Sequence, residues 1–503
     1  MRLSRNLLAG VTNSIWAALI GLAVVPFYLK YLGVEAYGLI GFFVTTQAVL
    51  SLLDMGMAPT INREVARCSA LGNLTEAGKL LHTLAVVYWG MAALIALLII
   101  SLAPLIADYW LQSKQLSSQA ISRAVILMGF VVACRWPIGL YQGALIGAQR
   151  LALSSAVNLV MATIGSLGAV AVLVFVSPTI EAFFIWQACT GIVHAIAMRL
   201  TAWRIIGKSD QIKFDFVKFK SVWRFTAGMS GISLTSLLFT QLDKLMLSKM
   251  LSLEEFGHYM LATVVVSGLH VMISPVFNVI YPRMTALVAT GDTVGLTDFY
   301  RVGTRLLLAV LFPAAMVLAI FSEELVRVWT GNLGIAISVA PVMALLAVGS
   351  ALNGVMHFPY ALQLAYGMTW IPLLINIVLM CFIAPLIIFL THAYGALGGA
   401  MAWVTTAVAY LFLGPWLTHR FILKNVGSKW LFQDVGIPLL ISVLIGLISY
   451  HIVHSTEYST LLKFMWGGGL VLSAFGLIFL ISIRLNSAAW SFVRLAVLNP
   501  MKK

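Results

Sequence analysis

Four charged residues stand inside long apolar stretches of the sequence: Asp54, Arg135, Asp243 and Lys244. A charged side chain in lipid costs several kcal/mol unless it faces a cavity, water or a partner. These positions are therefore the first candidates for a binding or transport site. Arg63, just beyond the second apolar stretch, adds a further cation.

Arg135 is the deepest of these charges, about 22 Å from Arg150 along a helix that rises 1.5 Å per residue. Trp136 and Pro137 follow it, which predicts a kink because proline cannot continue the helical hydrogen bonds. Its guanidinium could bind an anionic head group in a cavity. The alternative is a structural role, in which it pairs with a carboxylate or with carbonyls freed by the kink.

Asp54 and Asp243 are acids suited to carry a coupling proton or cation. Asp54 stands beside Gly56 and Pro59, where a helix break is expected. Asp243 and Lys244 are neighbours, and neighbours on a helix point about 100° apart, so we expect them not to neutralise each other. Lys244 is near enough to the external interface to extend its ammonium group toward water. For both acids a structural role remains the alternative.

Motifs of enzymes and of cofactor sites are absent from the sequence. Gly207-Lys208-Ser209 ends like a phosphate-binding loop, but Ala202 stands where the first glycine should be. The cysteines are scattered without metal or redox spacing, and no clustered carboxylates or His-Glu-x-x-His occur. We expect no metal, no cofactor, no nucleotide and no enzymatic activity, so active transport would use an ion gradient or the gradient of the substrate.

The elements that must position these residues are membrane-spanning helices. Hydrophobic residues make up 61% of the 503 residues, charged residues only 10%, and the mean hydropathy is +0.99. A bilayer core needs about 20 apolar residues per helical span, and backbone in lipid must satisfy its own hydrogen bonds. The fold class predicted is an all-α polytopic membrane protein. About 14 spans are expected, near residues 10–30, 36–58, 81–107, 121–147, 152–176, 181–203, 223–249, 256–281, 302–321, 335–356, 369–390, 395–418, 435–454 and 462–483.

The net charge of +14 follows the topology. If the N-terminus is cytoplasmic and the spans alternate, most of the 31 Lys and Arg residues fall on the cytoplasmic side. This is the distribution of the positive-inside rule. It predicts cytoplasmic N- and C-termini and makes a nucleic-acid partner unnecessary to explain the charge.

Two six-helix blocks look like copies of each other. Lys30-x-Leu32-x-x-Glu35-x-Tyr37-Gly38 recurs as Lys249-x-Leu251-x-x-Glu254-x-Phe256-Gly257, at a constant offset of 219 residues. An even number of helices per block gives parallel repeats, which in transporters enclose a central cavity. We expect two pseudo-symmetric lobes, residues 1–220 and 221–424, and an additional helix pair with a cytoplasmic tail, residues 425–503.

An ordered set of short motifs resembles a known family. The motifs are Leu32-Gly33-Val34-Glu35-Ala36-Tyr37-Gly38, Leu53-Asp54-Met55-Gly56, Asn62-Arg63-Glu64-Val65-Ala66-Arg67, Tyr141-Gln142-Gly143 with Gly147-Ala148-Gln149-Arg150, Gln241-Leu242-Asp243, Phe312-Pro313, Val328-Trp329-Thr330-Gly331 and Tyr394-Gly395-Ala396-Leu397-Gly398-Gly399-Ala400. They resemble the Wzx-type polysaccharide-biosynthesis flippases, within the multidrug/oligosaccharidyl-lipid/polysaccharide exporter superfamily. Each motif alone is weak, and the ordered set points to the superfamily without fixing the sugar.

The resemblance implies a bacterial inner-membrane protein that flips an undecaprenyl-diphosphate-linked glycan to the periplasmic leaflet for an O-antigen-like surface polysaccharide. The partners implied are membrane lipids, a proton or cation gradient, and the polysaccharide polymerase and chain-length machinery. Arginine suits a diphosphate because its guanidinium is a fixed fork of donors. Arg135, Arg63 and Lys244 are our candidates for substrate binding, and Asp54 and Asp243 for ion coupling.

Three rival functions fit the sequence less well, and the additional helix pair argues against the first of them. A cation-coupled multidrug exporter of the same superfamily should have twelve helices and more carboxylates in its lobes. A lipid II flippase is nearer in chemistry and harder to exclude. A membrane glycan polymerase or ligase usually carries a large periplasmic loop with catalytic residues, and no external loop here is long enough.

Overall fold

A computed structural model describes residues 2–54, 57–71, 74–207, 234–424, 426–455 and 460–485. Within these ranges the chain is helical apart from short turns and one isolated bridge between Gln112 and Ser252. The predicted all-α class is confirmed. The predicted domain boundary at residue 220 and the cytoplasmic tail lie outside the described residues.

Two of the helices are long enough to cross a membrane twice, and each contains a break at a glycine. Helix α1 (Arg2–Leu50) is interrupted at Gly33, whose φ is 82° and ψ 174°. Helix α14 (Trp370–Phe421) is interrupted at Gly395, with φ 58° and ψ −136°. Both dihedral pairs combine a positive φ with non-helical ψ, which only glycine adopts readily. Each break separates two of the spans predicted from the sequence.

The described residues contain 10 helical stretches that are long and apolar enough to span a membrane. Counting α1 and α14 twice brings the number of passages to twelve. The helix over residues 234–250 and α17, which contains the shorter apolar stretch Gly468–Leu480, occupy the two remaining apolar blocks of the sequence. This agrees with the number of apolar blocks in the sequence.

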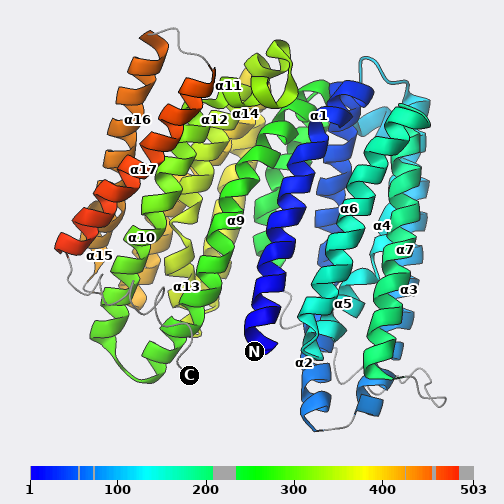
Figure 1. Ribbon diagram of the computed structural model, residues 1–503, viewed down its shortest axis with the longest axis horizontal. Helices are drawn as coiled ribbons and strands as arrows, with labels where there is room; N and C mark the ends of the chain where they lie inside the picture. Colours follow the sequence, from blue (N-terminus) through cyan, green and yellow to red (C-terminus); the bar gives the residue numbers. More distant parts are fainter. Residues whose placement is uncertain are drawn as a thin grey trace. The chain divides into compact units, whose positions relative to one another are not determined.

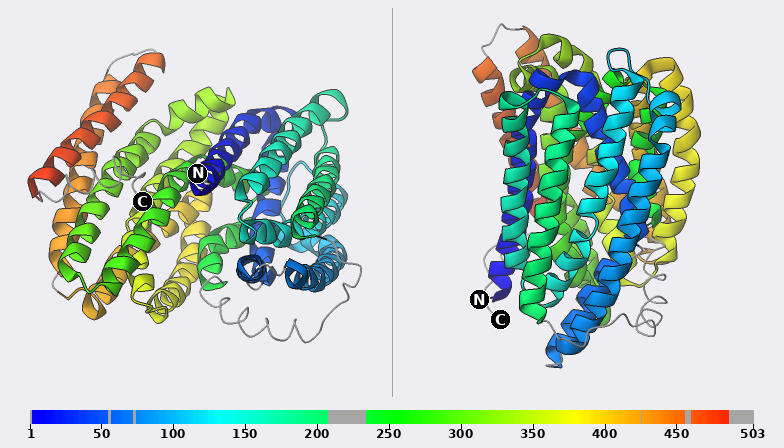
Figure 2. Two further views of the ribbon diagram at one scale, coloured as in Figure 1. Left: turned by 60° about the horizontal axis from the view of Figure 1, so that its bottom comes forward. Right: turned by 90° about the vertical axis from the view of Figure 1, so that its right-hand side faces the viewer.

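The chain packs as two compact units, Met1–Gly257 and His258–Lys503. In the first unit α6 packs against α1, α4 against α3 and α7, and α5 against α2. The blue-to-teal helices of this unit form one bundle in the right-hand view of Figure 2. After α1 its elements are η1 (Ser51–Asp54), α2 (Met57–Ala70), α3 (Leu74–Leu105), η2 (Ile106–Trp110), α4 (Ser118–Arg135), α5 (Ile138–Gly147), α6 (Leu151–Phe175) and α7 (Ile180–Ile206).

The second unit is built around α10, which packs against α12, α16 and α17. Figure 1 shows α16 and α17 running beside α10. A short π-helical turn, η3, leads into α16 and also packs on α10. Apart from α14, its elements are α9 (Leu253–Ala289, which begins in the first unit), α10 (Thr293–Ile320), α11 (Ser322–Thr330), α12 (Leu333–Gly354), α13 (His357–Ala365), α15 (Gly427–Lys429), η3 (Trp430–Gly436), α16 (Ile437–Ser455) and α17 (Thr460–Leu485).

Polar residues start several helices at the ends of the apolar runs. Ser117, Thr179, Asp292 and Asn332 precede α4, α7, α10 and α12, and each side-chain oxygen accepts a hydrogen bond from the amide three residues ahead. Such a cap satisfies one of the amides that the first turn leaves without a partner. These residues fix where the spans begin.

Two glycines of the family-like motifs hold α5 against α2. A Cβ on Gly143 would lie 2.6 Å from the Ala58 carbonyl oxygen, and one on Gly147 would lie 2.3 Å from the Asn62 oxygen. Only glycine allows this approach, as in the small-residue interfaces of membrane helices. The motifs around Asn62 and Tyr141 are therefore two sides of one helix contact.

The two copies of the sequence repeat meet at their glycines, within the first unit. A Cβ on Gly38 would lie 2.2 Å from the Leu253 carbonyl oxygen, and one on Gly257 would lie 2.6 Å from that of Val34. The buried carboxylate of Glu35 accepts hydrogen bonds from the Ser113 hydroxyl and from the amides of the residues that follow it. The residues shared by the two copies therefore pack backbone against backbone. Hydrogen bonds to Glu35 hold the loop that starts at Ser113 beside this contact.

Candidate functional site

Arg135 is the last residue of α4, where the span breaks before α5. Trp136 and Pro137 form the junction, as predicted. The side chain projects among α1 and α7: its Nη2 donates to Gln187 Oε1 at 2.5 Å, and its guanidinium carbon lies 5.8 Å from the centre of the Phe43 ring. The break in the helix and two neighbouring helices therefore hold this charge in place.

The surroundings of Arg135 are uncharged but not closed. The residue is half-buried, although it lies well inside the 30-residue span Ser118–Gly147. No carboxylate forms an ion pair with it in the part of the chain that the structure describes. A charge with these properties fits an internal polar cleft far better than lipid. The guanidinium has five N–H donors, and one Gln187 oxygen occupies only a part of them.

Gly191 leaves the space that the Arg135 side chain fills. A Cβ at this position would lie 3.3 Å from Arg135 Cγ, so a larger residue would press on the arginine. On the other side, Phe43 packs edge-on against Phe184 at 5.5 Å. An aromatic face beside a cation stabilises it by about 0.5–2 kcal/mol. Phe43 and Gly191 thus fix the position of the cation without neutralising it.

Asp54 accepts two hydrogen bonds close to the start of α2. It ends η1, its Oδ2 accepts a hydrogen bond from the Ala58 amide at 3.3 Å, and its Oδ1 accepts one from the Tyr88 hydroxyl. The Tyr88 ring packs at 6.5 Å from that of Trp136, the residue after Arg135. The break expected near Gly56 and Pro59 is present, since α1 ends at Leu50 and α2 starts at Met57.

Lys244 and Asp243 form an ion pair, which corrects one expectation from the sequence. Lys244 Nζ lies 3.0 Å from Asp243 Oδ1 and 3.2 Å from Oδ2, and it also donates to the Thr240 carbonyl at 3.0 Å. The prediction that adjacent positions do not neutralise each other is wrong here. The long, flexible lysine side chain reaches back across the angle that separates the two Cβ atoms.

Arg63 lies on α2 with a carboxylate already beside it. Its Nη2 is 2.8 Å from Glu64 Oε1, and Arg67 binds the other oxygen of the same carboxylate at 2.9 Å. The Arg63 side chain is 56% exposed. Of the five predicted site residues, the structure brings Asp243 and Lys244 together and gives the other three partners of their own.

A second buried arginine lies in the other unit, and the sequence analysis missed it. Arg301 and Arg305, one turn apart on α10, both pair with Asp434 of η3, at 2.6 Å and 3.1 Å. Asp434 and Arg305 are 0% and 2% exposed. Arg305 Nε and Nη1 have no hydrogen-bond partner among the described residues. Because 133 residues separate Arg301 from Asp434, no sequence spacing could signal this pair.

Gln187 and Phe43 were also missed. Gln187 had a usable signal, because a lone amide within the apolar run of α7 needs a polar partner in a membrane. Phe43 had none, since a phenylalanine in such a span is ordinary.

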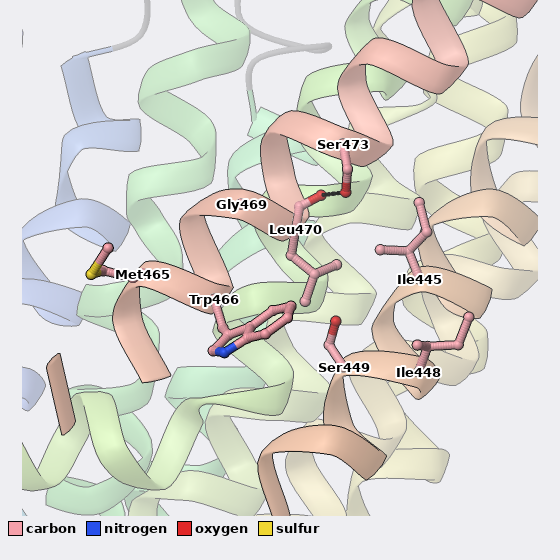
Figure 3. Close-up of a pocket in the computed structure, with 8 residues that line it drawn as sticks. All are labelled: Ile445, Ile448, Ser449, Met465, Trp466, Gly469, Leu470 and Ser473. Carbon is pink, nitrogen blue, oxygen red and sulfur yellow. Dashed lines mark hydrogen bonds between the residues drawn. The ribbon is translucent and has the colours of Figure 1, made fainter. Parts of the chain in front are cut away.

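An apolar pocket of about 510 Å³ lies between α16 and α17 (Figure 3). Its walls include Ile445, Trp466 and Leu470, and its hydroxyls come from Ser449 and Ser473. Ser473 donates to the carbonyl of Leu470 in its own helix at 3.0 Å. This surface suits a hydrocarbon chain better than a sugar, because it offers little hydrogen bonding.

Comparisons with solved structures agree with this architecture. The lipid II flippase MurJ, in an inward closed conformation, matches with a TM-score of 0.70 at 13% identity, covering 95% of this chain and 100% of that one. A multidrug resistance MATE family transporter of the MOP superfamily, in an inward-facing conformation, matches with a TM-score of 0.64 at 12% identity, covering 84% and 100%. At these identities the likeness shows the fold.

Sequence comparisons show the family. A Shigella flexneri protein described as a candidate O-antigen transporter is 22% identical over 426 residues, covering 82% of this chain and 98% of that protein. The family model for polysaccharide biosynthesis proteins matches residues 3–288, more than half of the chain. The resemblance seen in the motifs is thereby confirmed, and the chain belongs to the polysaccharide biosynthesis protein family.

Proposed function

We propose that this protein is a flippase that moves an undecaprenyl-diphosphate-linked oligosaccharide repeat unit from the cytoplasmic to the periplasmic leaflet. The glycan would then enter an O-antigen-like surface polysaccharide. The observation that carries the proposal is Arg135, a half-buried guanidinium inside a membrane span whose side-chain partner is a neutral amide. Such a cation can bind a phosphate without first losing a carboxylate.

The chemistry of a diphosphate fits this position. Arginine presents planar donors that match phosphate oxygens in pairs, and such charge-assisted bonds are about twice as strong as neutral ones. Gln187 and Phe43 hold the guanidinium, so little side-chain entropy remains to be lost on binding.

Lys244 and Arg63 would be secondary phosphate contacts in this scheme. Each already has a carboxylate beside it, Asp243 and Glu64 respectively. A coupling ion bound at Asp243 would compete with Lys244 for the carboxylate, which gives ion coupling a direct route to substrate binding. Asp54, bound by Tyr88, would be the second coupling acid. We place the protein in the bacterial inner membrane with both termini cytoplasmic, acting beside the polymerase and chain-length machinery.

The test compares Arg135→Ala and Arg135→Lys in a native-host strain that lacks the chromosomal copy. Surface polysaccharide and lipid-linked repeat units on the cytoplasmic face are measured together, with protein amounts matched by immunoblot. Loss of a hydrogen bond to a charged group costs about 1.5–3 kcal/mol, so Arg135→Ala should lower transport by about ten- to a hundredfold. Arg135→Lys should retain more activity than Arg135→Ala.

The matched control is Arg199→Gln, which removes an exposed arginine from α7. It should transport like the parent. If Arg135→Ala also transports like the parent, the phosphate-binding role is wrong. Normal surface glycan with new drug sensitivity in the strain that lacks the protein would instead indicate a multidrug exporter. Rescue of a strain depleted of its lipid II flippase would indicate the lipid II branch.

A further inference from the structure

A pair of polar side chains lies beside Arg135 and has no role in the scheme above. His194 of α7 and Asn158 of α6 join the two helices through a hydrogen bond of 3.0 Å between His194 Nε2 and Asn158 Oδ1. Both residues are half-buried within stretches that are apolar enough to span a membrane. Polar side chains at this depth face the interior or a cavity rather than lipid.

The pair shares a helix face with the residues that touch Arg135. Gln187 and Gly191 contact the arginine, and His194 follows them three residues after Gly191. Residues three and four apart on a helix are neighbours on one side. From Gln187 to His194 this polar strip of α7 covers about 10 Å along the axis, at 1.5 Å per residue.

The pair keeps hydrogen-bonding capacity that the described residues do not use. With Oδ1 accepting from His194 Nε2, Asn158 retains the two donors of its amide nitrogen, and a neutral His194 retains Nδ1 as an acceptor. Asn158 Nδ2 and His194 Nδ1 have no partner among the described residues and are not fully buried, so a ligand or water can reach them. The pair thus presents donors on one residue and an acceptor on the other, which suits the hydroxyl groups of a sugar.

We propose that Asn158 and His194 form a sugar subsite beside the phosphate-binding Arg135. The inference rests on the proposed function and deepens it: Arg135 holds the diphosphate, and this pair holds hydroxyl groups of the sugar that the diphosphate carries. A phosphate selects the arginine, because only the arginine brings a charge. A sugar selects the neutral pair, which offers a donor and an acceptor but no net charge.

The test measures binding of two lipids to the full-length protein in detergent. The probes are undecaprenyl diphosphate without sugar and the lipid-linked repeat unit extracted from the host strain that lacks this protein. Their Kd values are determined by native mass spectrometry for the parent, Asn158→Ala and His194→Ala. One lost neutral hydrogen bond is worth about three- to tenfold in Kd. We expect each substitution to weaken the repeat-unit lipid by that factor and to leave undecaprenyl diphosphate within about twofold.

Thr163→Val is the matched control, because Thr163 also joins two helices of this unit through a hydrogen bond, to Trp16 Nε1 at 2.9 Å. It should leave both Kd values unchanged. Equal weakening of both lipids by Asn158→Ala and His194→Ala would mean that the pair only holds α6 to α7, and it would overturn the subsite. Unchanged binding of both lipids would overturn it as well. The proposed function is tested separately by Arg135→Ala, which should weaken the binding of both lipids. Unchanged binding of both lipids by this variant would contradict the phosphate-binding role of Arg135.

Discussion

Two buried arginines, one in each unit, have opposite surroundings. Arg305 lies 2% exposed beside a carboxylate, with Arg301 bound to the same group. Arg135 lies half-buried beside a neutral amide and an aromatic ring. Both stand in helical stretches that are long and apolar enough to span a membrane.

The comparison teaches that the partner of a cation inside a span decides what the cation can do. Arg305 forms an ion pair with Asp434 that connects α10 to η3. Because η3 leads into α16, this ion pair fixes where α16 begins. Desolvation of such a pair offsets much of its attraction, so its value lies in the geometry that it specifies. The charge of Arg135 stays available for an anion, because none of the carboxylates that the structure describes forms an ion pair with it. Substitutions that exchange these surroundings test the distinction.

The largest effect is expected from Asp434→Ala, which leaves Arg301 and Arg305 without their shared carboxylate. Removing one partner of a buried ion pair destabilises a protein by about 3–5 kcal/mol. The measurement is size-exclusion chromatography of detergent extracts after heating to a series of temperatures. The folded fraction of Asp434→Ala should be lost at much lower temperature than that of the parent. Asp292→Asn is the control: asparagine caps helices as well as aspartate does, so the start of α10 should keep its stability. A folded Asp434→Ala protein with parental thermal stability would contradict the structural role.

The next effect is expected from Gln187→Glu, which gives Arg135 the kind of partner that Arg305 has. The protein should stay folded, but transport should drop by about tenfold or more, because a carboxylate competes with the diphosphate and each 1.4 kcal/mol is a factor of about ten. Surface polysaccharide at matched protein amounts measures it. Gln187→Leu removes the acceptor without adding charge and should retain more activity. Parental transport by Gln187→Glu would show that the neutrality of the partner is unimportant.

A smaller effect is expected from Phe43→Leu, which removes the aromatic face beside Arg135 and keeps an apolar side chain of similar size. A cation on an aromatic ring at a site that is not closed is stabilised by about 0.5–1 kcal/mol, so binding of undecaprenyl diphosphate should weaken about two- to fivefold. Native mass spectrometry of the purified protein gives the Kd. The substitution Phe43→Tyr keeps the ring and should bind like the parent. The prediction fails if Leu and Tyr at this position have the same Kd.

The smallest effect is expected from Arg63→Gln. Its side chain is 56% exposed, the Glu64 carboxylate beside it keeps Arg67 as a second partner, and ion pairs open to solvent contribute about 0–1 kcal/mol. Stability should be unchanged and transport should fall by less than about threefold. A loss comparable to that of Arg135→Ala would make Arg63 a principal phosphate contact.

The spans and their breaks could be predicted from the sequence because they follow from local chemistry. Apolar length sets the spans, and Gly33, Pro137 and Gly395 stand where the helices break. Arg135 could be found because a lone charge in an apolar run is conspicuous. What surrounds it could not, since Gln187 and Phe43 come from other helices.

Two features of the site could not be predicted from the sequence: how far a flexible side chain reaches, and which residues distant in the sequence pair with each other. The angle between positions 243 and 244 predicts separate side chains, yet the flexible lysine closes the gap. Asp434 lies near the start of a predicted span and carries no signal of its distant arginines. Backbone periodicity places a residue on a face, but it does not choose among the rotamers available there.

The contact between Gly38 and Gly257 has a consequence for the origin of the chain. Gly38 touches Leu253, and Gly257 touches Val34, so the same pair of positions meets twice under the offset of 219 residues. That reciprocity is the property of an isologous interface, in which one patch faces its own copy across a two-fold axis. Two separate half-length chains could make the same contact. The chain therefore retains, at this point, the self-complementary surface that a homodimer would need.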